Sequence, residues 1–250
     1  MENQTADFSI TLSAADAGAA FLPLLRQLLL GDLTASLLHD LNNPLTAILN
    51  YTRLLQMTPF QPEETAEFTK SIAAEGERMA GMTSRIRALA IETRVEGRSA
   101  KLHEALTLAL AFNKTRFRHD GIAVEMPGEP NLPNTKLALG GLLQLLLPAL
   151  EQGRQALKAL PPETEKKLRF ILTENATHRQ RLTITHNGAC SPEMGANFLR
   201  ALFPHSLQPE QIRIAAAMTR ILLNQFHCHA SVETLANGWA ALHLDIPAEG

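Results

Sequence analysis

The chain has little of several features that would point to particular classes of protein. Its 250 residues include two cysteines, Cys190 and Cys228, which are too few for a disulfide framework. The formal net charge of -2 gives no general attraction to nucleic acid or to an anionic membrane. No apolar run reaches the roughly 20 residues that a membrane-spanning helix needs. The start of the chain, Met1-Glu2-Asn3, lacks the positive charge of a secretory signal. We therefore expect a cytoplasmic protein with no membrane span and no nucleic-acid partner.

The first part of the chain predicts a polar tail over residues 1–12 and then a helical hairpin over residues 13–97. Prolines at 59 and 62 end the first helix and open the second, because proline cannot continue the hydrogen-bond ladder of a helix. Two helices cannot bury both of their apolar stripes alone, so the pattern predicts a homodimer that forms a four-helix bundle. The stripe of the first helix recurs at spacings of three, four and seven, at Leu33, Leu37, Leu41, Leu45, Ile48 and Leu55.

The second part, residues 100–250, predicts an α+β domain in which a sheet carries helices on one face. The pair Asn237-Gly238 is the turn signal of a closing hairpin. Helices are expected over residues 102–118, 137–160, 192–203 and 209–226, and strands over 121–126, 168–173, 181–185, 230–235 and 240–246.

The segment around His39 carries the chemistry of the first part. It reads Ser36-Leu37-Leu38-His39-Asp40-Leu41-Asn42-Asn43-Pro44-Leu45 and lies within the predicted helix. A neutral imidazole can attack phosphorus and hold a phosphoryl group on nitrogen. Asp40 is placed to accept a proton from the ring or to orient it, and Asn43 lies one helical turn beyond on the same side.

This segment closely resembles the phospho-accepting motif of sensor histidine kinases, and the hairpin resembles their dimerisation and phosphotransfer domain. The resemblance implies that His39 is the phospho-acceptor and Asp40 the general base or orienter. It also implies that Asn43 positions a water molecule for hydrolysis of an aspartyl phosphate on a partner.

The second domain resembles the ATP-binding domain of the same kinases, but its nucleotide-binding signatures are degenerate. The family's two asparagines, one of which holds Mg²⁺, fall at Pro148 and Gln152. The aspartate that bonds the adenine amino group falls at His186, and of the glycines that follow it only Gly188 remains.

The phosphate-binding turn of the family is glycine-rich, whereas here it reads Arg213-Ile214-Ala215-Ala216-Ala217-Met218, where Cβ atoms obstruct a phosphate. We therefore expect no nucleotide cofactor and no autophosphorylation from ATP.

Other candidate sites are weaker. Adjacent residues of a strand point to opposite faces, so His227, Cys228 and His229 could not all share one metal ion, and no metal site is predicted. Cys190 is interpreted as an ordinary cysteine rather than a reactive thiol.

Three functional hypotheses follow from these features. The leading one is a dimeric protein that passes a phosphoryl group between the aspartates of receiver domains of response regulators through His39. The second is a response-regulator phosphatase that uses Asn43. The third is a pseudokinase scaffold or inhibitor that binds a receiver, or a partner histidine kinase in a mixed dimer.

Overall fold

The protein is described here from a computed structural model, which covers residues 31, 38–57, 60–91, 98–175, 177–188 and 209–249. The polar tail over 1–12, the start of the first helix and the helix predicted over 192–203 lie outside these residues. Within the part described, no helix combines the length and apolar character needed to cross a membrane.

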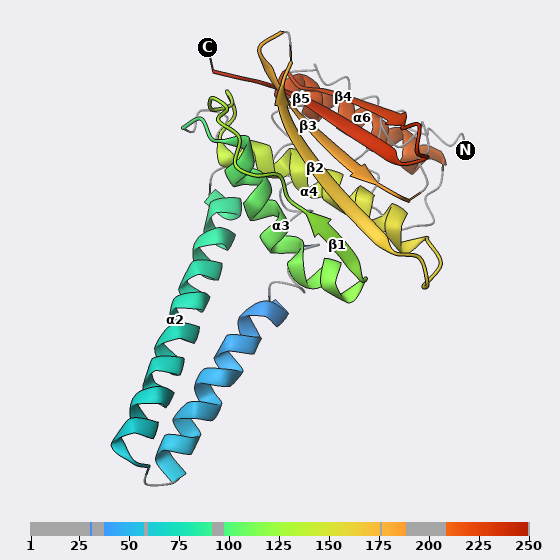
Figure 1. Cartoon of the computed structure of the whole chain (residues 1–250). Helices are drawn as coiled ribbons and strands as arrows, with labels where there is room; N and C mark the ends of the chain where they lie inside the picture. The colour runs from blue at the N-terminus through green and yellow to red at the C-terminus, as the bar shows by residue number, and fades with distance from the viewer. Residues whose placement is uncertain are drawn as a thin grey trace, which may run out of the picture.

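The first domain is a hairpin of two antiparallel helices that projects from the rest of the molecule (Figure 1). Residues 38–57 form its first arm, and α2 (Pro62–Ile91) forms the second. At the start of α2 the Glu64 carboxylate accepts a hydrogen bond from the Gln61 backbone N–H, and Glu63 and Glu64 lie in the first turn, where the helix dipole favours negative charge. The predicted hairpin is therefore present.

In the described residues, the second domain is a five-stranded mixed sheet with the helices α3 (Leu102–His119), α4 (Leu139–Lys158) and α6 (Pro209–Gln225) on one face (Figure 1). These helices alternate with the strands β1 (Ile122–Glu125), β2 (Lys166–Glu174), β3 (Arg179–His186), β4 (His229–Thr234) and β5 (Ala240–Pro247). The strand order is β1-β2-β3-β5-β4, with β1 parallel to β2 and the other pairs antiparallel. The predicted α+β architecture is confirmed, with element boundaries within about two residues in most cases.

The sheet buries one face because its apolar residues alternate in register across the strands. Phe170 of β2 pairs with Ile184 of β3, which pairs with Leu242 of β5, and all three are buried. Burying each such side chain contributes about 1.5–3 kcal/mol. The opposite face carries polar pairs such as Arg181 and Asp245, whose Nε and Oδ1 atoms lie 2.7 Å apart.

The closing hairpin between β4 and β5 turns where the sequence predicted it. Gly238 has φ of +80°, a backbone conformation that residues with a Cβ rarely adopt. The Asn237 side-chain oxygen accepts a hydrogen bond from the Trp239 backbone N–H at 3.1 Å. The Asn-Gly pair therefore acts as the turn.

Helix α4 is the centre of the second domain and is buried on nearly every side. It is apolar over most of its circumference and lies between α3 and the sheet (Figure 1). Ion pairs join the C-terminal end of α4 to α3. Arg154 forms ion pairs with Glu151 and with Asp120 at the end of α3, and Arg116 of α3 lies 3.7 Å from Glu151. Although burial opposes ionisation, the hydrogen bond from Arg154 holds the pKa of Asp120 below its usual value.

Candidate functional site

The helix over residues 38–57 presents three different faces. Leu41, Ile48 and Leu55 are half-buried and lie on one face. Tyr51, on the same face, contacts Phe68 of α2 with ring centroids 5.7 Å apart, so this face packs within the hairpin. Because a helix advances by about 100° per residue, Leu38, Leu45 and Leu49 lie on a second face.

His39 lies on the third face, and its side chain is 61% exposed. The Asp40 Oδ1 atom lies 3.5 Å from His39 Nδ1, and the Asn43 Nδ2 atom lies 3.5 Å from the same ring nitrogen. The two predicted partners of the imidazole thus meet at Nδ1, and the other nitrogen, Nε2, is not engaged by either of them. This arrangement leaves one ring nitrogen for a reaction while the other is held by polar neighbours.

Asp40 also contacts the second domain, which the sequence did not predict. Thr115 of α3 donates a hydrogen bond from its Oγ1 atom to Asp40 Oδ1 at 2.6 Å. The side chain of Asp40 is 15% exposed, so α3 covers it while the adjacent imidazole stays open. Figure 1 shows the start of the 38–57 helix beside α3. No sequence pattern marks Thr115, because a threonine on a helix has no distinguishing pattern of its own.

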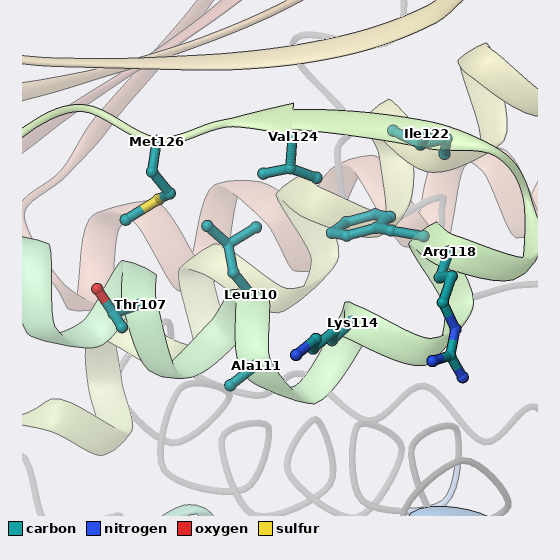
Figure 2. A pocket seen from close by; sticks show the side chains of 9 residues that line it. Thr107, Leu110, Ala111, Lys114, Arg118, Ile122, Val124 and Met126 are labelled. Atoms are coloured by element: carbon teal, nitrogen blue, oxygen red, sulfur yellow. The ribbon is translucent and has the colours of Figure 1, made fainter.

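A groove of about 470 Å³ opens on α3 beside this contact, between α3 and the edge strand β1. Figure 2 shows Val124 of β1, Met126 just after this strand and Leu110 of α3 directed into the space between the two elements. Lys114 and Arg118 line the same groove, and both are exposed. The groove therefore combines an apolar floor with positive charge at its edge.

Pro148 and Gln152, the positions that the sequence analysis compared with two asparagines of sensor histidine kinases, lie on α4. Pro148 is inside this helix and has no side-chain ligand atom, and Gln152 is 7% exposed. Both residues are part of the packed interior of the domain. The turn predicted over residues 213–218 lies within α6, and residues 189–208 lie outside the described part of the chain.

His186 is a buried core residue at the end of β3. It is 7% exposed, and a Cβ added at Gly153 of α4 would lie 3.7 Å from its ring. Burial lowers the pKa of His186 to about 4, partly offset by a hydrogen bond with the Gly188 backbone. The imidazole is therefore neutral at pH 7, and its Nδ1 atom has no hydrogen-bond partner within the described residues.

Gly188 is required for packing at this point. A Cβ on Gly188 would lie 2.8 Å from the backbone carbonyl of Ala156 in α4, a distance that Cβ atoms essentially never adopt. The glycine that survives from the family's signature thus has a structural role of its own, because it lets the end of β3 approach α4.

The remaining candidates have no shared site. His227 has φ of +51° in the turn after α6, Cys228 is buried, and His229 is exposed at the start of β4. Burial raises the pKa of the Cys228 thiol to about 12. Among the described residues no group of three or more His, Cys, Asp or Glu side chains could hold a metal ion, and Cys190 lies outside them.

Comparison with known proteins places the hairpin in a family. Residues 29–93 match the model of the His Kinase A (phospho-acceptor) domain. No curated protein matches the chain significantly.

Among solved structures the chain is similar to full-length ShkA in complex with AMPPNP, with 16% identity, a TM-score of 0.49, and coverage of 88% of this chain and 46% of ShkA. The chain thus spans less than half of the length of ShkA. It is also similar to the histidine kinase AdeS of Acinetobacter baumannii, with 11% identity, a TM-score of 0.43, and coverage of 85% of this chain and 98% of AdeS. A bacterial phosphotransferase has 18% identity and a TM-score of 0.43, over 94% of this chain and 98% of that chain.

The buried state of His186 predicts a specific dependence of stability on pH. Its pKa is about 4 in the folded chain and near 6.5 in an unfolded chain. Between these values the unfolded state binds a proton that the folded state does not, so folding weakens as the pH falls. We expect His186 to account for a loss of about 2 kcal/mol between pH 7 and pH 5.

Urea unfolding of the wild type and of His186→Gln at both pH values measures this loss. The variant should lose less stability on acidification, whereas His229→Gln, a change at an exposed histidine, should follow the wild type. Equal losses in the wild type and in His186→Gln would show that His186 is protonated in the folded protein.

Proposed function

Because the chain carries the phospho-acceptor domain of two-component signalling histidine kinases, we propose that it is a phosphotransfer protein. It receives a phosphoryl group from the aspartate of one receiver domain on His39 and passes it to the aspartate of another. The second domain does not supply the phosphoryl group from ATP and instead helps to bind the receiver.

The observation that carries this proposal is the contrast between His39 and the degenerate nucleotide positions. The imidazole of His39 is exposed and held at Nδ1 by two polar neighbours. Gln152 and His186 are buried among core residues, and Gly188 packs against the α4 backbone. These features favour a phosphoryl group that arrives from outside the chain.

The transfer follows from the chemistry of the imidazole. Nε2 of His39 attacks the phosphorus of the aspartyl phosphate, and the N–P bond forms as the P–O bond to the aspartate breaks. The electron pair leaves with the carboxylate of the receiver. The Nδ1 proton stays on the ring, where the Asp40 carboxylate stabilises the positive charge that develops. The reverse sequence delivers the phosphoryl group to the second receiver.

Docking of the receiver is assigned to the groove between α3 and β1 together with the helix that carries His39. The groove lies on the same helix as Thr115, which contacts Asp40, so a partner that reaches His39 also meets α3. Lys114 and Arg118 suit a partner that presents carboxylates around an apolar side chain.

A dimer is part of the proposal because the hairpin leaves an apolar stripe uncovered. Leu38, Leu45 and Leu49 are 55%, 40% and 46% exposed. Leu45 and Leu49 each lie within about 20° of Leu38 around the helix, since seven and eleven residues are close to two and three full turns. A second hairpin covers such a stripe in a four-helix bundle.

One observation favours phosphatase activity as a second candidate. The Asn43 amide lies one helical turn beyond His39, with its Nδ2 atom 3.5 Å from His39 Nδ1. An amide at this position can orient a water molecule for attack on phosphorus. In phosphotransfer the phosphoryl group is held on the His39 imidazole. In phosphatase activity it passes directly from the receiver aspartate to water.

The first prediction concerns phosphoryl flow. With two purified receivers, one phosphorylated, the wild-type chain should move the label to the second receiver, and His39→Gln should abolish this movement. The substitution removes the nucleophile and keeps a polar side chain of similar length. The assay follows the label on each protein after separation.

His229→Gln, the same substitution at an exposed histidine of the second domain, is the matched control and should retain transfer. Movement of the label in His39→Gln would contradict the proposal. Loss of label from the receiver without any label on a second receiver, abolished by Asn43→Ala, would assign the phosphatase function instead.

The second prediction concerns docking at the groove. Lys114→Glu reverses a charge beside the apolar floor and should raise the KM for an acidic receiver about five- to tenfold, with kcat little changed. Lys136→Glu makes the same change in charge at an exposed lysine far from the groove and should leave the KM unchanged. Equal effects of the two substitutions would show that only net charge matters.

The third prediction concerns the dimer. The double substitution Leu45→Glu and Leu49→Glu places two charges in the apolar stripe, so it should convert a dimer into a monomer in light scattering. Leu54→Glu introduces a charge at an exposed leucine on a different face and should leave the dimer intact. A wild-type chain that is monomeric at micromolar concentration would refute the dimer.

A further inference from the structure

Thr115 of the second domain forms a side-chain hydrogen bond to the helix that carries His39. Its hydroxyl donates to Asp40 Oδ1 at 2.6 Å, across 75 positions of sequence. The same Oδ1 atom faces His39 Nδ1 at 3.5 Å. One carboxylate oxygen thus lies between a hydroxyl of α3 and the imidazole of the phospho-acceptor.

This geometry fixes the direction of the Asp40 carboxylate. A carboxylate oxygen has lone pairs for more than one donor, so Oδ1 can accept from Thr115 and from the ring together. Without the contact to α3, the χ angles of Asp40 would sample several rotamers. The hydrogen bond from Thr115 selects the rotamer in which Oδ1 points toward Nδ1.

The direction of this carboxylate decides which nitrogen of His39 can react. A carboxylate beside Nδ1 favours the tautomer with the proton on Nδ1, which leaves the lone pair on Nε2. The Asn43 amide N–H, with its Nδ2 atom 3.5 Å from the same nitrogen, can only donate and favours the opposite tautomer. The position of the Asp40 carboxylate therefore sets the balance between the two tautomers. Attack on phosphorus needs that lone pair on the exposed nitrogen. The charged groups nearest to the contact in sequence are Asp40 itself and, on α3, Lys114 and Arg116.

We propose that Thr115 is a positioning residue for phosphoryl transfer, through which the second domain sets the tautomer and reactivity of His39. This inference rests on the proposed function of His39 and extends it. It gives the second domain a direct effect on the chemistry, in addition to docking. The contact lies within one chain, so each second domain acts on the histidine of its own protomer.

A hydrogen bond that only held the two domains together would have different consequences. Thr115→Val keeps the shape and the methyl group of the side chain and removes the hydroxyl. Thr115→Ser keeps the hydroxyl and removes the methyl group. A packing role predicts that the valine variant is active and the serine variant impaired, and a positioning role predicts the reverse.

The first readout is transfer from a phosphorylated receiver at saturating concentration. In Thr115→Val we expect kcat to fall about tenfold or more with the KM unchanged, because a hydrogen bond to a charged group is lost. Thr115→Ser should stay within about twofold of the wild type. Wild-type kcat in Thr115→Val, or an equal loss in Thr115→Ser, would overturn the proposal.

The second readout is independent of any receiver. Nitrogen-15 NMR of the histidine rings reports the tautomer of His39, which is assigned by comparison with His39→Asn. The share of the Nδ1–H tautomer should fall in Thr115→Val and recover in Thr115→Ser. An identical tautomer ratio in all three proteins would refute the coupling. Absence of transfer in the wild type would refute the proposed function alone, because the NMR comparison would still decide the coupling.

Discussion

The packing of α4 between α3 and the sheet is the constraint on which the rest of the molecule depends. Gly188 allows the end of β3 to approach α4 closely, because a Cβ there would lie 2.8 Å from the Ala156 backbone. A Cβ at Gly153 would lie 3.2 Å from the Leu168 side chain, so this contact is also tight. The same packing places Gln152 and His186 in the interior. Two positions that the sequence analysis compared with a nucleotide site are thereby part of the core.

That packing also determines where α3 lies. Ion pairs of Arg154 with Glu151 and Asp120 join α4 to the end of α3. Breaking a buried ion pair of this kind costs about 3–5 kcal/mol, so α3 is held firmly in place. On its outer side α3 presents Thr115 to Asp40 and the groove beside it. The core of the second domain is thus connected, through α3, to the surroundings of His39.

His39 and His186 have different chemical properties because one is exposed and the other is buried. His39 is exposed and surrounded by polar groups, so it is available to a partner. His186 is buried and has a lowered pKa, so it stays neutral and belongs to the core. The sequence predicted the first role from the motif around His39. It identified His186 as a degenerate position, but its burial against α4 depended on a tertiary contact.

Much of the fold was predictable because its signals are local. Apolar periodicity located both helices of the hairpin, Pro62 marked the start of α2, and Asn237-Gly238 marked the closing turn. The contact between Thr115 and Asp40 was not predictable, because no local pattern distinguishes a threonine that meets a residue 75 positions away. The groove was equally hidden, since it forms only where the edge strand β1 lies over α3. The roles of His39, Asp40 and Asn43 in catalysis stay predictions.

Phosphorus-31 NMR of the purified chain, recorded first with ATP and Mg²⁺ and then after addition of a phosphorylated receiver, tests the central claim most directly. A phosphohistidine signal that is absent with ATP and appears with the receiver is the result that this account predicts. A phosphohistidine signal with ATP alone would contradict it, because the second domain would then bind and use the nucleotide.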